Sequence, residues 1–307
     1  MLSLILAALL SDPVATPVSL PSQPAPLHGT LLTPESPRAV AVILPGSGPT
    51  DRDGNSPMGV SGGAYRLLAE ALAEQGIATL RADKRGIAQS AAGGMSETDL
   101  RFSHFVEDAR GWAAQAAART GRPCAWLIGH SEGALVALAA TEGGNDKVCG
   151  LVLLSGAGRP ARIVLEEQLG PQLPEPMRTQ AFHAMAELEA GRLAPDTPPE
   201  LAALFRPSVQ PYLISWFRLD PARLIADWDG PVMIGQGLTD IQTSETDARA
   251  LAAARPDATL VLWEGVNHLL KIAPADRAAN LATYSDPALP LAPDVADDIA
   301  GFILQPR

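Results

Sequence analysis

The chain has 307 residues, of which 47% are hydrophobic and 19% charged, a composition typical of a folded globular protein rather than a disordered one. Its formal net charge of −11 repels phosphate backbones, and no run of Lys or Arg offsets it locally, so the sequence argues against nucleic acid as a partner. The length suits one large α/β domain or two ordinary ones.

The chain begins with an apolar run, MLSLILAALL, which is too short to span a bilayer. This run resembles the hydrophobic region of a signal peptide, and a Pro-rich stretch over residues 11–26 follows it. We therefore interpret residues 1–26 as a candidate signal peptide and Pro-rich segment, and we expect a periplasmic or secreted protein. Since no basic residue precedes the run and no small-x-small cleavage site follows it, a cytoplasmic protein with an unstructured N-terminus is the alternative.

From Leu27 onward, apolar runs alternate with segments of helical periodicity, which predicts an α/β fold with a mostly parallel sheet and helices on both faces. The apolar runs are continuous, as is typical of strands buried on both faces. The predicted strands are 40–44, 77–81, 125–129, 150–154, 232–235 and 259–263, with an edge strand from Leu27. The predicted helices are 64–76, 105–119, 131–140, 247–254 and 295–304.

Cys124 and Cys149 each precede a predicted strand. Two cysteines are too few for a disulfide framework or a zinc site. We favour the interpretation that they are two small buried side chains. If the two strands are neighbours, a disulfide between them is the alternative.

The alternation of strands and helices breaks between about residues 160 and 229. This segment is helix-like, is interrupted by prolines, and carries large apolar side chains at Phe205, Tyr212, Trp216 and Phe217. An insertion that leaves the carboxyl ends of parallel strands lies near the crevice where such sheets bind ligands. We therefore predict a helical cap whose four large side chains line the substrate site. Peripheral helices without substrate contact are the alternative.

The clearest chemical motif is Gly129-His130-Ser131-Glu132-Gly133, which lies between a predicted strand and an Ala/Leu-rich helix. In that context a G-x-S-x-G turn lifts the serine hydroxyl above the sheet, and its glycines let strand and helix pass closely. The helix N-terminus directs free amides and a positive dipole end at a developing oxyanion. Ser131 is the predicted nucleophile, and a simple helix cap is the alternative.

A serine nucleophile needs a base, and the base needs an orienting carboxylate. With this turn the chain order is serine, acid, histidine. Of the two histidines after Ser131, His183 falls in a predicted cap helix and His268 follows the last predicted strand, so His268 is the predicted base. Asp240 is the first carboxylate after the preceding strand and is the predicted acid, whereas Asp247 fits the first turn of the next helix.

The loop after the strand at 40–44 reads PGSGPTDRDGN, and its glycines let backbone amides approach a reacting carbonyl. We predict the N–H groups of Ser47 and Glu132 as the oxyanion donors. The alternative is a plain strand-to-helix connection, since the loop lacks dinucleotide and phosphate-loop fingerprints.

Two polar clusters lie near this loop, one at Asp51, Arg52 and Asp53 and one at Asp83 and Arg85. We favour charge-assisted hydrogen bonds that brace the loop. Binding of a substrate carboxylate by either arginine is the alternative.

The segments LPGSGPTDRDGNS, LRADKRGIAQS, GHSEGALVA, GLTDIQT and VNHLLK together resemble those of bacterial α/β-hydrolases of the esterase and serine-aminopeptidase-like groups. The resemblance runs from about Leu27 to the C-terminus. It implies an α/β-hydrolase domain over residues 27–307, with the cap inserted at about 160–229. The chain departs from this pattern at Ala88, where relatives often carry Gly, and in PGSG, where many members have HGxG.

The predicted reaction is acyl transfer to water through an acyl-enzyme on Ser131, with Asp240 and His268 completing the triad. It requires no metal and no organic cofactor. The expected partner is a small-molecule ester with a small to moderate acyl or alcohol group, and the sequence leaves the oligomeric state open.

Three other functions compete with this prediction. A peptidase or amidase would use the same triad, and the candidate ligands of a substrate ammonium are Glu166, Glu167, Glu187 and Glu189. A thioesterase would also use this triad. A non-catalytic ligand receptor is the alternative from another class, because a fold does not by itself define a function.

Overall fold

The computed structural model describes residues 12–306 and has one eight-stranded sheet at its centre. The order across the sheet is β1-β2-β4-β3-β5-β6-β7-β8, parallel from β4 to β8 and antiparallel at β1 and β2. The strands are β1 (Val14–Leu20), β2 (Leu27–Thr33), β3 (Ala39–Leu44), β4 (Ile77–Ala82), β5 (Ala125–His130), β6 (Val148–Leu154), β7 (Val232–Gly237) and β8 (Thr259–Trp263). The predicted fold class is confirmed.

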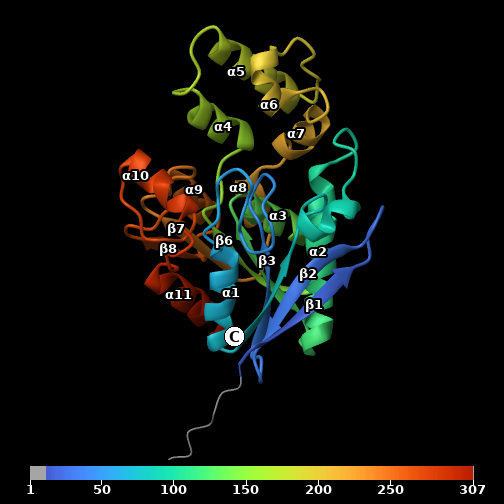
Figure 1. Ribbon diagram of the computed structural model, residues 1–307, viewed down its shortest axis with the longest axis vertical. Helices are drawn as coiled ribbons and strands as arrows, with labels where there is room; N and C mark the ends of the chain where they lie inside the picture. Colours follow the sequence, from blue (N-terminus) through green and yellow to red (C-terminus); the bar gives the residue numbers. More distant parts are fainter. Residues whose placement is uncertain (1–11, 307) are drawn as a thin grey trace, which may run out of the picture.

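Helices cover both faces of the sheet (Figure 1). Alternate residues of β3 show the division, because Val40 and Val42 join one apolar cluster and Ala41 and Ile43 join the other. The first cluster packs against α2 (Phe102–Thr120), α3 (Glu132–Thr141), α8 (Pro221–Ala226) and α9 (Glu245–Ala254). The second packs against α1 (Ala64–Glu74) and α11 (Pro293–Leu304).

Several further helical elements are short. They are α10 (Arg277–Ala282) and the 3-10 turns η1 (Ala88–Gly93), η2 (Pro199–Leu201) and η3 (Thr283–Ser285). Within residues 12–306, no helix has the length and apolar character needed to cross a membrane.

Strand β1 corrects the predicted N-terminal boundary. The sequence predicts that residues 1–26 precede the domain, but β1 pairs with β2 from Val14 opposite Thr33 to Leu20 opposite Leu27. Its proline at position 17 fits because an edge strand tolerates a missing N–H. The apolar start of the predicted signal peptide lies outside the described residues.

Cys124 and Cys149 form a disulfide, so the favoured interpretation of two separate buried side chains is wrong. The sulfurs meet because β5 and β6 are neighbours in the sheet, with Ala125 opposite Val148 at their starts. The Cα atoms of the two cysteines are 5.2 Å apart, within the range that a disulfide needs.

Between β6 and β7 the chain leaves the sheet and forms α4 (Ala161–Leu169), α5 (Met177–Glu189), α6 (Ala202–Phe205), α7 (Gln210–Phe217) and α8. Figure 1 shows α4 to α7 as a separate layer above the sheet. Helix α5 packs against α4 and α7 and buries Ala181, Ala184, Met185 and Leu188. We call α4 to α7 the cap.

Candidate active site

Ser131 occupies the sharp turn between β5 and α3. Its φ of 56° and ψ of −121° lie in a region that residues with a side chain rarely adopt. Its N–H donates to the carbonyl of Leu154 at 2.9 Å, which ties the turn to the end of β6. A Cβ at Gly129 would lie 2.2 Å from the carbonyl oxygen of Gly133, and one at Gly133 would lie 2.3 Å from that of Leu44. Only glycine fits at these two positions.

Asp240 and His268 meet at the carboxyl ends of β7 and β8. His268 Nδ1 lies 2.7 Å from Asp240 Oδ2, and both side chains are buried. The backbone N–H groups of Gln242 and Thr243 donate to Asp240 Oδ1, and the Thr243 hydroxyl donates to Oδ2.

These contacts fix the protonation of the pair. Burial raises the pKa of Asp240, but the imidazole and the two backbone donors outweigh burial and bring that pKa to about 2. Asp240 is therefore an ionised acceptor, so the proton lies on His268 Nδ1. The other ring nitrogen, Nε2, is the atom that can accept a proton.

The alternative carboxylate, Asp247, and the other downstream histidine, His183, lie elsewhere. Asp247 caps the start of α9 together with Ser244 and forms an ion pair with Arg159, with 3.0 Å between Nε and Oδ1. His183 is exposed on α5. Among residues 12–306, no group of three or more His, Cys, Asp or Glu residues is arranged to hold a metal ion.

A cavity of about 100 Å³ adjoins the serine turn. It brings together Ser131 and the residues of both predicted oxyanion donors, Ser47 and Glu132. Its remaining lining is mainly apolar and comes from α3, the cap, the start of α8 and the loops after β6 and β7: Leu135, Ala157, Arg159, Ala161, Val164, Leu165, Gln168, Trp216, Pro221, Gln242 and Thr243.

Of the four large cap side chains that we predicted to line the site, only Trp216 lines this cavity. Phe205, Tyr212 and Phe217 are buried in the apolar cluster that joins the cap to the sheet. The prediction is therefore wrong for these three. Large apolar side chains in a short helical insertion are needed for its own packing, and the sequence does not separate that use from a pocket lining.

A larger and more polar cavity of about 540 Å³ lies next to the first. The two share Arg159, Val164, Gln168, Gln242 and Thr243. Gln172 and Arg277 also line the larger one.

The loop after β3 passes directly against the serine turn, since a Cβ at Gly46 would lie 3.2 Å from Ser131 Cβ. Gly46 is held from both sides. Its N–H donates to Tyr65 Oη at 3.0 Å, and its carbonyl accepts from Lys84 Nζ at 3.0 Å.

A chain of hydrogen bonds links this loop to the predicted base. His130 Nε2 lies 2.7 Å from the carbonyl oxygen of His268, and because a carbonyl only accepts, Nε2 is the donor. Burial, followed by the nearby His268 ring, lowers the pKa of His130 to about 3, so its ring is neutral. Nδ1 then accepts from the hydroxyl of Tyr65, 2.8 Å away.

The sequence does not predict the contacts of Lys84 and Tyr65 or the role of His130. His130 lies inside the G-x-S-x-G motif, which marks its position but not its partners. Tyr65 lies on α1 and Lys84 after β4, and nothing in their local sequence indicates that they contact the loop.

The arginines near the loop are engaged in ion pairs. Arg52 contacts Asp83 through its guanidinium at 2.5 Å and through its backbone N–H at 2.8 Å. Arg85 contacts Asp108 on α2. Asp53 pairs with Arg81. The Arg52–Asp83 and Asp53–Arg81 contacts support the interpretation that these residues brace the loop, whereas the partners of Arg85 lie away from it. Both Arg52 and Arg85 already pair with protein carboxylates, which argues against binding of a substrate carboxylate by either one.

A known protein family matches less than half of the chain. The model of the serine aminopeptidase S33 family matches residues 57–198. No curated protein matches the sequence significantly.

Solved structures share the fold over almost the whole chain. Est1E from Butyrivibrio proteoclasticus is 18% identical with a TM-score of 0.58, covering 96% of this chain and 98% of that chain. TT1662 from Thermus thermophilus is 20% identical with a TM-score of 0.58, covering 97% and 100%. Proline iminopeptidase from Mycobacterium smegmatis is 15% identical with a TM-score of 0.54, covering 83% and 92%.

Proposed function

We propose that the chain is a hydrolase of the α/β-hydrolase superfamily and that it cleaves carboxylic esters with Ser131, His268 and Asp240 as its catalytic triad. The observation that carries the proposal is the buried contact of 2.7 Å between His268 Nδ1 and Asp240 Oδ2. This contact leaves Nε2 free of the acid, and Ser131 lies on a strained turn that faces a cavity.

The reaction proceeds in two steps. His268 Nε2 accepts the proton of Ser131 as its Oγ attacks the ester carbonyl, and Asp240 stabilises the imidazolium that forms. The N–H groups of Ser47 and Glu132 bind the oxyanion of the tetrahedral intermediate. The bond to the alcohol breaks, and the alcohol takes the proton from His268. Water then attacks the acyl-enzyme with the same proton transfers and releases the acid and Ser131.

The contacts of four glutamates favour an esterase over an aminopeptidase. An aminopeptidase needs a carboxylate that is available to bind the substrate ammonium. Each candidate is paired with an arginine of the cap region: Glu167 with Arg159, Glu166 and Glu189 with Arg162, and Glu187 with Arg192.

The two cavities suggest which esters fit. The cavity at Ser131 is small and mainly apolar, which suits a short acyl chain. The larger cavity beside it is lined by Gln168, Gln172, Gln242 and Arg277, whose side chains suit a polar alcohol group. We therefore propose a short-chain acyl ester of a polar alcohol as the substrate class.

We also propose export to the periplasm or the medium. The disulfide between Cys124 and Cys149 supports this, because disulfides persist in oxidising compartments. Cell fractionation with detection of the native protein tests the proposal, and recovery only from the cytoplasm with reduced cysteines would contradict it.

One experiment tests the catalytic proposal. The enzyme and Ser131→Ala are labelled with a fluorophosphonate and assayed on aryl esters of two to ten carbons, prolyl anilide and acyl-CoA. We expect labelling only when Ser131 is present, a loss of turnover of about 10⁴-fold or more in Ser131→Ala, and the highest kcat/KM on short esters. Faster cleavage of the anilide or the thioester would replace the ester assignment, and turnover retained by Ser131→Ala would overturn the triad.

A further inference from the structure

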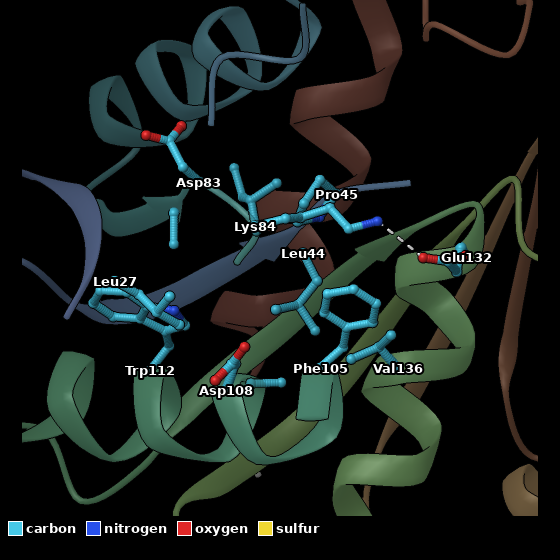
Figure 2. Close-up of a pocket in the computed structure, with 13 residues that line it drawn as sticks. Leu27, Leu44, Pro45, Asp83, Lys84, Phe105, Asp108, Trp112, Glu132 and Val136 are labelled. Carbon is cyan, nitrogen blue, oxygen red and sulfur yellow. Dashed lines mark hydrogen bonds and ion pairs between the residues drawn. The ribbon is translucent and has the colours of Figure 1, made fainter. Parts of the chain in front are cut away.

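Lys84 lies just after β4 with its side chain almost entirely buried. Its Nζ donates to the carbonyl of Gly46 and to Glu132 Oε1, each at 3.0 Å, and lies 4.7 Å from the centre of the Phe105 ring. Figure 2 shows the side chain extending toward Glu132, with Phe105 below it, on the wall of a small cavity of about 40 Å³. The proposed ester hydrolysis does not use this ammonium.

The bond from Lys84 to Gly46 fixes the direction of a neighbouring amide. The carbonyl of Gly46 and the N–H of Ser47 belong to one peptide group, which is planar and trans, so they point in opposite directions. An ammonium that holds the Gly46 oxygen on one side therefore directs the Ser47 N–H toward the other. The preceding peptide is fixed as well, because the Gly46 N–H donates to Tyr65 Oη.

The same ammonium also holds the residue of the second oxyanion donor. Glu132 is the first residue of α3, where backbone N–H groups have no partner within the helix. Its Oε1 accepts from Lys84, and its Oε2 accepts from the hydroxyl of Tyr212 on α7 at 2.9 Å. One buried charge thus connects the loop after β3, the start of α3 and, through Glu132, the cap.

We propose that Lys84 is a positioning residue that fixes the two backbone donors of the oxyanion hole relative to Ser131. This inference rests on the proposed function. Preorganised donors act on charge that develops in the transition state, and they add little to binding of the neutral ester. The ammonium also polarises the Gly46–Ser47 peptide group and so strengthens its N–H as a donor.

The first test is Lys84→Met, which keeps the length and apolar stem of the side chain. We expect kcat to fall about 10- to 100-fold, because a misplaced donor is less damaging than a deleted one, which costs about 10²- to 10³-fold. The KM for a short aryl ester should change by less than about threefold. A trifluoromethyl ketone with the same acyl chain forms an oxyanion on the serine, and its inhibition constant should rise by the same factor as kcat falls.

Arg85→Met is the matched control. Arg85 is the next residue and also forms a buried ion pair, but its partners are Asp108, Ser22 and the carbonyl of Gln23, away from the Gly46 loop. We expect Arg85→Met to lower stability while its kcat and its ketone inhibition constant stay within about threefold of the parent values.

A double variant separates positioning from charge neutralisation. Lys84→Met leaves the Glu132 carboxylate buried without its cation, which by itself destabilises the fold. Lys84→Met/Glu132→Gln removes both charges, and the amide oxygen still accepts from Tyr212. If Lys84 acts through the Gly46 carbonyl, the double variant stays impaired in kcat and in ketone binding. Recovery of both to within about threefold would overturn the inference, as would parent-like values in a folded Lys84→Met. Because Ser131→Ala tests the triad independently, these results leave the proposed function standing.

Discussion

Two buried polar clusters flank Ser131, and they are built differently. In the first, side chains of Asp240, His268 and Thr243 contact one another at the ends of β7 and β8. In the second, Lys84 and Tyr65 contact backbone atoms of Gly46. The first cluster suits proton transfer, which needs a titrating side chain, and the second suits stabilisation of charge by fixed backbone donors.

Because they are built differently, the two clusters tolerate different amino-acid substitutions. A proton acceptor depends on the chemical identity of a few side chains, so a single isosteric change abolishes its function. A backbone donor survives most substitutions of its own residue and depends instead on what holds the peptide group in place. The two clusters should therefore respond to mutation with losses of different size and kind.

The largest loss of kcat is expected from a substitution in the first cluster. Asp240→Asn keeps the shape of the side chain but removes the charge that orients His268, so kcat should fall about 10³- to 10⁴-fold. Steady-state kinetics on a short aryl ester measures it. Asp247→Asn is the matched control, since the side chain of Asp247 is as buried as that of Asp240 but pairs with Arg159. A loss at Asp247 as large as that at Asp240 would show that the acid is wrongly assigned.

The two clusters also explain how much of the molecule could be predicted from its sequence. The G-x-S-x-G turn, the loops after β7 and β8, and the order serine, acid, histidine constrain side-chain types, so the sequence pointed to Ser131, Asp240 and His268, two of which the structure brings into contact. Lys84 carried no such signal. It stands among charged residues in ADKRG, which resembles a solvated turn, and its partner Glu132 is 48 positions away.

Other differences between the predicted and the observed structure also originate in tertiary contacts. Strand β1 was missed because its proline obscures the strand pattern, although an edge strand accommodates it. The cap was predicted as a helical insertion, but the direction of each aromatic side chain depends on how the helices pack, which local sequence does not determine. The alternation of apolar runs and helical segments was sufficient for the sheet, because it reflects burial on both faces.

The second prediction compares a substitution in the core of the cap with one in the cavity wall. Phe205 is 1% exposed, and Phe205→Ala should lower the free energy of unfolding by about 3–5 kcal/mol. Acyl-length preference should not change in the folded fraction. Trp216 lines the cavity at Ser131, so Trp216→Ala should shift the preference toward longer acyl chains with a smaller loss of stability. Urea denaturation and kcat/KM for esters of two to ten carbons check both. If Phe205→Ala and Trp216→Ala show the same acyl-length preference, the assignment of Phe205 to the core and of Trp216 to the cavity wall is wrong.

A smaller effect is expected from Tyr65→Phe in the second cluster. The change leaves the Gly46 N–H and His130 Nδ1 without their partner, so kcat should fall about tenfold through loosened oxyanion donors. The free energy of unfolding should fall by about 1–3 kcal/mol. Tyr284→Phe is the matched control on the side of the first cluster, where the hydroxyl accepts from the Gln242 side chain. Its kcat should stay within about twofold. Equal effects of the two variants would mean that the Tyr65 hydroxyl has no special influence on turnover.

The smallest expected effect is a pH dependence of stability that originates in His130. Burial lowers the pKa of His130 from 6.5 to about 3 in the folded protein. Between these values the unfolded chain binds a proton that the folded protein does not, so the free energy of unfolding decreases as the pH falls from about 6.5 toward 3. One proton corresponds to about 1.4 kcal/mol per pH unit.

His130→Gln isolates this contribution, because an amide can still donate to the His268 carbonyl but does not titrate. The slope of unfolding free energy against pH, measured by urea denaturation between pH 6 and 4.5, should become shallower by up to about 1.4 kcal/mol per pH unit. The comparison uses slopes, so the loss of the Tyr65 contact at all pH values does not affect it. This window lies above the pKa of Asp240, about 2, so that carboxylate stays ionised in the folded protein throughout. His183→Gln, on the exposed face of α5, is measured in parallel as a second replacement of histidine by glutamine. If His130→Gln and the parent show the same slope, His130 takes up a proton in the folded state, and its ring then donates at Nδ1 instead of accepting from Tyr65.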